Sequence, residues 1–224
     1  MSSEIRFRYD GDKQWVVKTP RVYRYLKKQW VDEFFEKGVL QLSSFEKFRE
    51  NPHEHAGDKN EGDAILVGTN DKQTVYSVVN YIPVGYVLCT SLKLSRKIAQ
   101  DFEQDACFRI NDTTGFGTAI AKCVPRCKGG VEGFCSYTFH KSINMRFNEL
   151  PLDNSGGLSL EKILSSYREN LETALMFAKG LTYIDQQEYR FAWGVPAPIE
   201  KTLRISCPEA RQFCDRVEIP DHST

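Results

Sequence analysis

The sequence lacks a long apolar segment, an excess of charge of either sign, and a hydrophobic N-terminal signal. No apolar run approaches the roughly 20 residues that a membrane-spanning helix needs. Thirty Lys and Arg residues balance thirty Asp and Glu, and this formal net charge of +0 gives no long-range attraction to nucleic acid or to an anionic membrane. The opening Met-Ser-Ser-Glu-Ile-Arg-Phe-Arg contains no secretory signal. We therefore expect a cytoplasmic protein that does not act at a membrane.

Histidine is scarce, and the number of cysteines is odd. The chain has 4 His and 7 Cys, which without a secretory signal indicates reduced thiols. Cys123 and Cys127, with Cys107 upstream and Cys135 downstream, have the loose spacing of free thiols and lack the second tight pair of a zinc site. No cysteine, histidine and acid combine into a recognisable nucleophilic triad.

A polar segment at 49–63 is rich in groups that bind metals. It contains His53, Glu54, His55, Asp58, Glu61 and Asp63. Imidazoles and carboxylates at this density are ligands for zinc, manganese or iron. A flexible loop does not preset metal geometry, however, so we expect a solvated loop, a lid or an acceptor-recognition loop, and no metal site. A metal-dependent hydrolase that uses this loop is the third functional hypothesis.

The length of 224 residues suits one domain spanning 1–224, and the 41% hydrophobic content is enough for a full core. Apolar periodicity separates strands from helices. Strands are predicted at 22–28, 39–45, 64–69, 74–80, 84–90, 107–110, 134–140, 189–193 and 202–205, and helices at 29–37, 95–102, 117–123, 159–179 and 206–216. The two kinds of element do not alternate strictly. The pattern predicts an α+β fold with a mixed, mainly antiparallel sheet core and flanking helices.

The segment Gln186 to Trp193 is the most informative part of the chain. Tyr189, Phe191 and Trp193 alternate with Arg190 and Ala192, which is the two-residue period of a strand. Glu188 stands at the entry of that strand, where rigid backbone would hold a carboxylate well for catalysis. The structural alternative is an ordinary solvated Glu at a strand entry.

Three separated segments form a recognisable order: Arg24 in the first predicted strand, Cys89-Thr90-Ser91 ending a middle strand, and Gln186-x-Glu188 opening a late strand. This order is similar to the Arg-Ser-Glu class of ADP-ribosyltransferases, as is the strand-helix-strand opening. The resemblance implies an ADP-ribosyltransferase-like fold and NAD as the substrate. The chain also resembles a group of bacterial proteins with a late Gln-x-Glu-Tyr-Arg segment, which implies no activity.

The same resemblance implies roles for individual residues. Glu188 would stabilise the positive charge that develops on the ribose, Gln186 would orient the acceptor, and Ser91 would position Glu188. Arg24 would clamp the pyrophosphate, since a guanidinium fork suits phosphate oxygens. The remaining cofactor-binding candidates are Tyr23, Tyr25, Thr90, Ser43 and Phe45, of which Tyr23, Tyr25 or Phe45 would stack on nicotinamide.

Alternatives to these assignments remain open. The tripeptide begins with Cys89 where the class has Ser. Arg21 competes with Arg24 for the clamp, and alternation places the two on opposite faces of the strand. Ser43 and Ser44 compete with Ser91. The non-functional interpretation makes Arg24 part of a surface ion pair and Thr90 and Ser91 caps of a turn.

The leading hypothesis is an NAD-dependent mono-ADP-ribosyltransferase-like enzyme whose acceptor is a protein, a nucleic acid or water, the last making it an NAD glycohydrolase. The association of that class with bacterial and phage conflict suggests a toxin or defence factor. The alternative is a non-catalytic module that binds a nucleotide or a partner protein through the same cleft.

Overall fold

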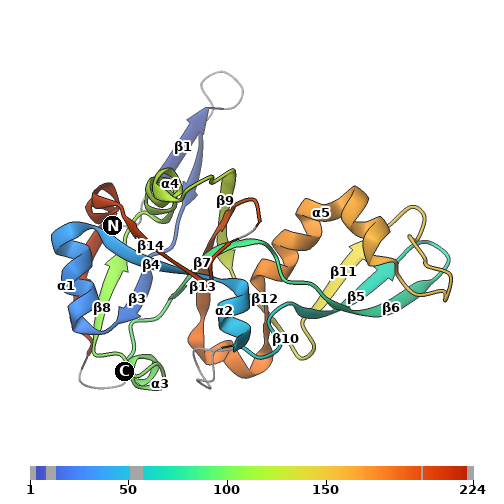
Figure 1. Cartoon of the computed structure of the whole chain (residues 1–224), viewed down its shortest axis with the longest axis horizontal. Helices are drawn as coiled ribbons and strands as arrows, with labels where there is room; N and C mark the ends of the chain where they lie inside the picture. The colour runs from blue at the N-terminus through green and yellow to red at the C-terminus, as the bar shows by residue number, and fades with distance from the viewer. Residues whose placement is uncertain (1–3, 9–13, 51–57, 198, 221–224) are drawn as a thin grey trace.

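The computed structural model describes residues 4–8, 14–50, 58–197 and 199–220. Their fold is a mixture of helices and mostly antiparallel strands, as the α+β prediction expected. The parallel pairs between its named strands are β10 (Ser136–Thr138) with β12 (Ala178–Gly180), and β11 (Ser142–Arg146) with β5 (Asp63–Thr69). Figure 1 shows a main body and a smaller lobe that extends from it on the right.

An eight-stranded sheet forms the main body, with the order β14-β4-β7-β3-β8-β15 and with β13 and β9 joined to β7. Its strands are β3 (Val22–Leu26), β4 (Val39–Ser44), β7 (Gly85–Ser91), β8 (Ala106–Ile110), β9 (Gly129–Phe134), β13 (Glu188–Gly194), β14 (Thr202–Ser206) and β15 (Cys214–Val217). The strand predicted from the Tyr-Phe-Trp alternation is therefore an inner strand, because β13 pairs with β7 on one side and with β9 on the other.

The sheet divides at β7. Along one edge, β7 pairs with β13 over its whole length, from Gly85 to Ser91. Its other edge is shared, since β4 pairs with it at Tyr86 and Val87 whereas β3 pairs with it at Ser91. Between these two points the Cys89 carbonyl accepts a hydrogen bond of 2.7 Å from the side chain of Arg24 on β3 instead of from a backbone amide. The divergence of β3 and β4 opens the sheet next to the residues that end β7.

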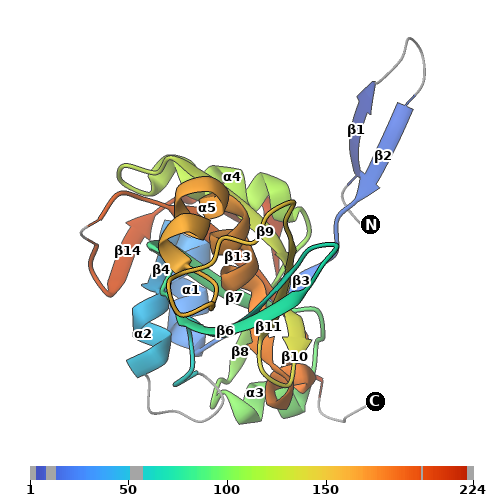
Figure 2. The same cartoon turned by 90° about the vertical axis from the view of Figure 1, so that its right-hand side faces the viewer.

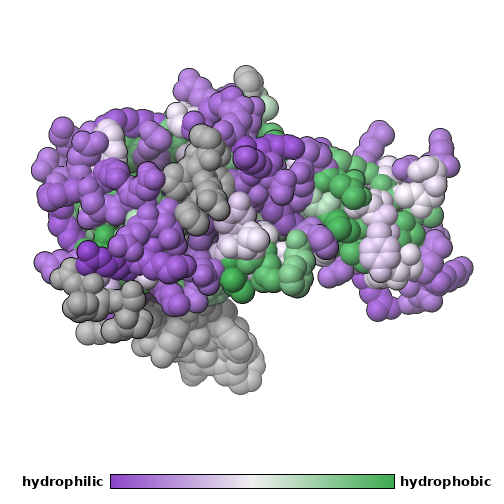
Figure 3. All heavy atoms as spheres, turned by 90° about the horizontal axis from the view of Figure 1, so that it is seen from below, coloured by the Kyte–Doolittle hydropathy of each residue, from purple (hydrophilic) through white to green (hydrophobic). Residues whose placement is uncertain are grey.

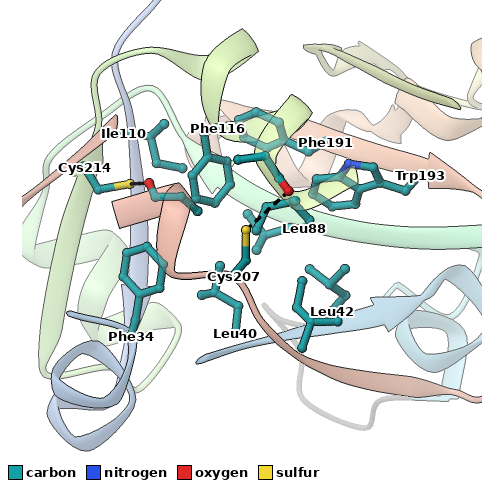
Figure 4. Packing of buried hydrophobic residues seen from close by; sticks show 14 of the residues in the cluster. Phe34, Leu40, Leu42, Leu88, Ile110, Phe116, Phe191, Trp193, Cys207 and Cys214 are labelled. Carbon is teal, nitrogen blue, oxygen red and sulfur yellow. Dashed lines mark hydrogen bonds between the residues drawn. The ribbon is translucent and has the colours of Figure 1, made fainter. Parts of the chain in front are cut away.

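The main core lies between this sheet and two helices, α1 (Lys28–Lys37) and α4 (Thr113–Cys123). Figure 4 shows Phe34 from α1, Phe116 from α4 and Phe191 from β13 in this cluster. Helix α1 ends at Gly38, whose φ of 72° is the left-handed conformation that glycine adopts without strain. Trp30 on the same helix is 43% exposed, whereas the neighbouring Val31 is buried in the core.

The lobe has a core of its own. Strands β5, β6 (Thr74–Asn80) and β11 form a three-stranded sheet, and helix α5 (Leu160–Phe177) covers one face of it. Leu66, Ile163 and Leu171 are fully buried between them. The other face of the sheet is open, and Figure 3 shows apolar surface over this lobe on the right, beside a mostly hydrophilic body. Helix α5 leads directly into β12 and then into β13, so the lobe is joined to the strand that carries Glu188.

The remaining elements are short. They are β1 (Glu4–Arg8) and β2 (Gln14–Lys18), an antiparallel hairpin that projects from the body in Figure 2, the helices α2 (Phe45–Glu50) and α3 (Arg96–Asp101), and the 3₁₀ helices η1 (Leu181–Gln186) and η2 (Pro208–Phe213). Within the described residues, every helix is too short or too polar to cross a membrane.

Several predicted boundaries were wrong. Helix α4 starts at Thr113 rather than 117, because the Asp112 carboxylate caps it by accepting a hydrogen bond from the Gly115 amide. The predicted 206–216 helix is the 3₁₀ helix η2 followed by β15, whose pairing with β8 overrides helical propensity. The predicted 134–140 strand is divided between β9 and β10, and β11 was missed.

Candidate functional site

A cavity of about 350 Å³ lies where β3 and β4 diverge from β7. The candidates from the sequence that line it are Tyr23, Arg24, Tyr25, Ser43, Thr90, Ser91, Gln186 and Glu188. A second cavity, of about 290 Å³, lies between β3, α1 and β4, and the two share Arg24, Leu26, Gln41, Ser43 and Gln104 as lining residues. Arg24 therefore stands where the two cavities adjoin.

Phe45 is the exception among the predicted residues. Its side chain is fully buried in a small cluster with Val87, Met176 and Ala192, and it does not line the cavity. The prediction that Phe45 stacks on a ligand is not supported by this placement, because core packing holds the ring elsewhere. Phe48, one turn further along α2, lines the cavity instead.

Four charged side chains, one of which is Glu188, form a buried network. The Arg190 Nε donates to Glu188 Oε1 at 2.6 Å, and the Lys179 ammonium contacts Glu188 Oε2. Arg190 also bonds Glu61, with 3.0 Å between Nη1 and Oε1. Lys179 donates to Gln186 Oε1 at 2.6 Å. Glu61, Glu188, Lys179 and Arg190 are 1%, 4%, 6% and 2% exposed.

The charges in this network determine the ionisation of Glu188. Burial by itself would raise the pKa of this carboxyl, but the charges of Arg190 and Lys179 outweigh burial and hold its pKa well below the ordinary value. Burial by itself would lower the pKa of Lys179, but the Glu188 carboxylate outweighs burial and raises this pKa above its ordinary value. Glu188 and Lys179 are therefore both charged at neutral pH, and they face each other as a buried ion pair.

The turn into β13 is held by the predicted Ser91. Ser91 stands opposite Glu188 in the β7–β13 ladder, and its hydroxyl donates to the Gln186 carbonyl at 2.7 Å. Gln187, between the two candidate residues, has φ 41° and ψ 55°. This left-handed conformation is uncommon for a residue with a side chain and often marks a functional turn. The Gln187 carbonyl accepts a hydrogen bond of 2.9 Å from the Leu92 amide.

Arg24 brings a positive charge into the cavity. Its Nη1 bonds the Cys89 carbonyl, while its buried Nε has no hydrogen-bond partner among the described residues. Burial lowers the pKa of this guanidinium, although the effect on an arginine leaves it charged at neutral pH. Of the two arginines considered for the clamp, Arg24 lines the cavity and Arg21 does not.

The neighbouring tyrosine and threonine have structural partners. The Tyr25 hydroxyl donates to the Lys93 carbonyl at 2.7 Å, and the Thr90 hydroxyl donates to the Tyr189 carbonyl at 2.7 Å. Cys89 also lines the cavity, and burial raises the pKa of its thiol well above the ordinary value. An un-ionised thiol is a poor nucleophile, so Cys89 does not provide cysteine chemistry here.

The non-functional interpretation of the motif was wrong in two respects. Glu188 is buried rather than solvated, and Arg24 bonds a backbone carbonyl rather than forming a surface ion pair. It was correct in one respect, since the Ser91 hydroxyl also accepts a hydrogen bond of 3.1 Å from the Lys93 amide and so caps the following turn. Ser44, one of the serine alternatives, instead accepts a hydrogen bond from the Lys47 amide at the start of α2.

The loop considered for a metal is described only in part. His53, Glu54 and His55 lie outside the described residues. Asp58 forms a buried ion pair of 2.6 Å with Lys141, and Glu61 pairs with Arg190. In the part of the chain that the structure describes, no three His, Cys, Asp or Glu side chains gather as a metal site would require.

All seven cysteines are free thiols.

Sequence reasoning missed three members of the buried network. Arg190 could have been found, because it is two residues from Glu188 and strand alternation puts both side chains on one face. Lys179 is the last residue of the helix predicted at 159–179, and Glu61 falls in the polar segment at 49–63. Their burial depends on contacts between segments far apart in sequence, which no local pattern records.

Comparison with protein-family models, with curated proteins and with solved structures finds no match to this chain.

Proposed function

We propose that this protein cleaves the nicotinamide–ribose bond of NAD and transfers the ADP-ribosyl group, in the manner of an ADP-ribosyltransferase. One observation carries the proposal: Arg24, Ser91, Gln186 and Glu188 line one cavity although they lie far apart in the sequence. The segments meet there because β3, β7 and β13 are neighbouring strands, with Ser91 opposite Glu188 in one pair and opposite Tyr23 in the other. The finer assignment of an ADP-ribosyltransferase-like fold is part of the same proposal, and the division of the sheet beside β7 is compatible with it.

The position of Arg24 supports a dinucleotide as the ligand. NAD consists of two nucleoside halves joined by a pyrophosphate, and Arg24 stands between two adjoining cavities. Small-molecule sites range from roughly 300 to 1,000 Å³. The first cavity, of about 350 Å³, lies at the lower end of this range and the second, of about 290 Å³, just below it, so the two together suit a ligand of this size. The positive charge of Arg24 suits phosphate oxygens, as does its buried Nε, which has no hydrogen-bond partner among the described residues.

The chemistry assigned to Glu188 is electrostatic. When the bond from ribose to nicotinamide breaks, its electron pair leaves with the ring nitrogen and positive charge develops on the ribose. An ionised carboxylate bonded to a ribose hydroxyl stabilises that charge. Glu188 is ionised, and Arg190 fixes one of its oxygens. Its second oxygen must exchange the Lys179 ammonium for the ribose hydroxyl.

That exchange also defines the second candidate function. Both Glu188 oxygens already have cationic partners, so the carboxylate has a purely structural role if Lys179 does not move. The protein would then be a non-catalytic module that binds a nucleotide in the same cavity. This candidate predicts binding of NAD without release of nicotinamide.

The deciding experiment measures nicotinamide release from NAD by the purified protein, with Glu188→Gln as the test and Glu61→Gln as the matched control. Both substitutions are isosteric, and both remove one carboxylate from the same buried network. We expect Glu188→Gln to lower release by about 100-fold or more, the order of magnitude for loss of a transition-state electrostatic contact, and Glu61→Gln to lower it far less.

Near-UV circular dichroism identifies the variants that remain folded. Equal losses in two folded variants would mean that the network serves stability rather than chemistry. NAD binding by the wild type without any release would favour the binding module.

A further inference from the structure

The described part of the cavity contains no residue suited to remove a proton from an acceptor. Its three carboxylates all have cationic partners: Asp58 pairs with Lys141 at 2.6 Å, Glu61 with Arg190 at 3.0 Å, and Glu188 with Arg190 at 2.6 Å and also with Lys179. No histidine is among the described lining residues, and the Cys89 thiol is un-ionised. General-base catalysis needs a group whose basic form is available near neutral pH.

This lack of a base among the described lining residues limits the class of acceptor that they serve. A hydroxyl, an amide or a guanidinium group must lose a proton when it forms a bond to the ribose. A carboxylate carries no such proton at neutral pH and attacks directly. Its requirement is a cation that holds it in place, and Lys179 becomes available when the Glu188 Oε2 turns to the ribose hydroxyl.

We propose that the acceptor is the carboxylate side chain of an acidic peptide, held by the Lys179 ammonium beside Gln186. This inference rests on the proposed NAD cleavage. In the step, a carboxylate oxygen of the peptide bonds to C1 of the ribose as the bond to nicotinamide breaks. The electron pair of that bond goes to the ring nitrogen, which turns the cationic ring into neutral nicotinamide. No proton is taken up or released, and the product is an acyl ester.

The buried charge of Lys179 favours an anionic acceptor. When the Glu188 Oε2 turns to the ribose, the Lys179 ammonium loses its carboxylate partner in a buried region, which is unfavourable. One carboxylate of the acceptor replaces Glu188 as the partner of Lys179. A polyanionic nucleic acid is disfavoured because the chain has a formal net charge of +0 and no excess of basic residues to attract it.

The test uses the full chain with NAD labelled on its adenine and a set of peptides that differ at one position. The central residue is Glu, Gln, Ser or Arg, and an oligonucleotide with a 5′-phosphate is the nucleic-acid arm. We expect label on the Glu peptide at least tenfold above every other arm, and we expect hydroxylamine to remove that label and leave a hydroxamate, as for an acyl ester. Stronger labelling of the Ser or Arg peptide or of the oligonucleotide, or transfer to water alone, would overturn the proposal.

Substitution of Lys179 tests the proposed contact. Lys179→Arg keeps a cation and should keep the preference for the Glu peptide, whereas Lys179→Met should raise the KM for that peptide at least tenfold relative to the KM for NAD. The matched control is Lys141→Met, because Lys141 is also buried and paired with a carboxylate but does not line the cavity. Equal effects of the Lys179→Met and Lys141→Met substitutions on the peptide KM would contradict the assignment.

The two proposals fail in different ways. Nicotinamide release without label on the Glu peptide would reject the carboxylate acceptor and leave NAD cleavage standing. No nicotinamide release in any mixture would reject both.

Discussion

Ser91 and Glu188 stand directly opposite each other on β7 and β13, and the Ser91 hydroxyl donates a hydrogen bond of 2.7 Å to the carbonyl of Gln186. The serine therefore orients the turn that carries Glu188 rather than the carboxylate itself. It also accepts a hydrogen bond from the Lys93 amide, so one hydroxyl links the end of β7 to the start of β13.

Replacing Ser91 should loosen this link. We expect Ser91→Ala to lower the free energy of unfolding by about 1–3 kcal/mol, because a buried carbonyl and an amide lose their partner. It should also lower nicotinamide release, since Gln186 and Glu188 lose a fixed position. Urea denaturation followed by fluorescence measures the first effect. The control is Ser43→Ala, which also alters a serine that lines the cavity and should change stability by less than about 0.5 kcal/mol.

Arg190 should be essential for folding stability. Its side chain is 2% exposed and is the cation that Glu61 and Glu188 share. Breaking a buried ion pair typically costs about 3–5 kcal/mol, because the remaining charge stays buried without a partner, so we expect Arg190→Met to be destabilised by that order. The double variant Arg190→Met with Glu61→Gln should recover part of the loss. A double variant less stable than the sum of the single losses would contradict this account.

The sequence was sufficient to predict the class of fold and part of the candidate site. The alternation of Tyr189, Phe191 and Trp193 identified β13, and the side chains of Phe191 and Trp193 pack in the main core as that period requires. Arg24, Ser91 and Glu188 lie far apart in the sequence and were proposed as members of one site from the order of their segments. All three line the same cavity. Local pattern and strand chemistry were sufficient for these residues because each stands in or at the end of a regular strand.

Sequence reasoning failed where tertiary contacts determine burial. Lys179 is the last residue of the helix predicted at 159–179, but it lies in β12 and is buried against Glu188. Phe45 looked like the end of a strand, but it begins α2 and packs into the core. In both cases the local sequence is compatible with two environments, and the choice between them is made by segments far away along the chain.

Acid should weaken the protein through Glu188. Burial acts to raise its pKa, but Arg190 and Lys179 hold the folded-state pKa below the value of about 4.3 for an unfolded glutamate. A group with a depressed folded-state pKa contributes stability that is fully present above its unfolded pKa and is lost as the pH falls through the folded-state pKa. We therefore expect the free energy of unfolding to fall below about pH 4, with a shallower fall in Glu188→Gln. Denaturation curves measured between pH 7 and pH 2.5 check this, and parallel curves for the two proteins would exclude Glu188 as the source.

Substitutions of Gln187 test whether the backbone of the turn between Gln186 and Glu188 is strained. Its φ of 41° costs a residue with a side chain about 1–2 kcal/mol, which glycine avoids. Glycine also loses more conformational entropy on folding, so we expect Gln187→Gly to be stabilised by no more than about 1 kcal/mol. Gln187→Val should be destabilised, because a branched Cβ is least compatible with positive φ. Thermal denaturation ranks the three proteins, and the order Gly, Gln, Val is the expected result.

The same variants separate stability from function at this turn. The Gln187 carbonyl accepts a hydrogen bond from the Leu92 amide, and the residue connects Gln186, which Lys179 contacts, to Glu188. If the strained conformation serves to present both side chains to the cavity, Gln187→Gly should be more stable than the wild type yet release nicotinamide more slowly, since glycine allows the turn other conformations. Higher stability with unchanged release would mean that the contacts of Ser91 and Leu92 alone are enough to hold the two residues in place.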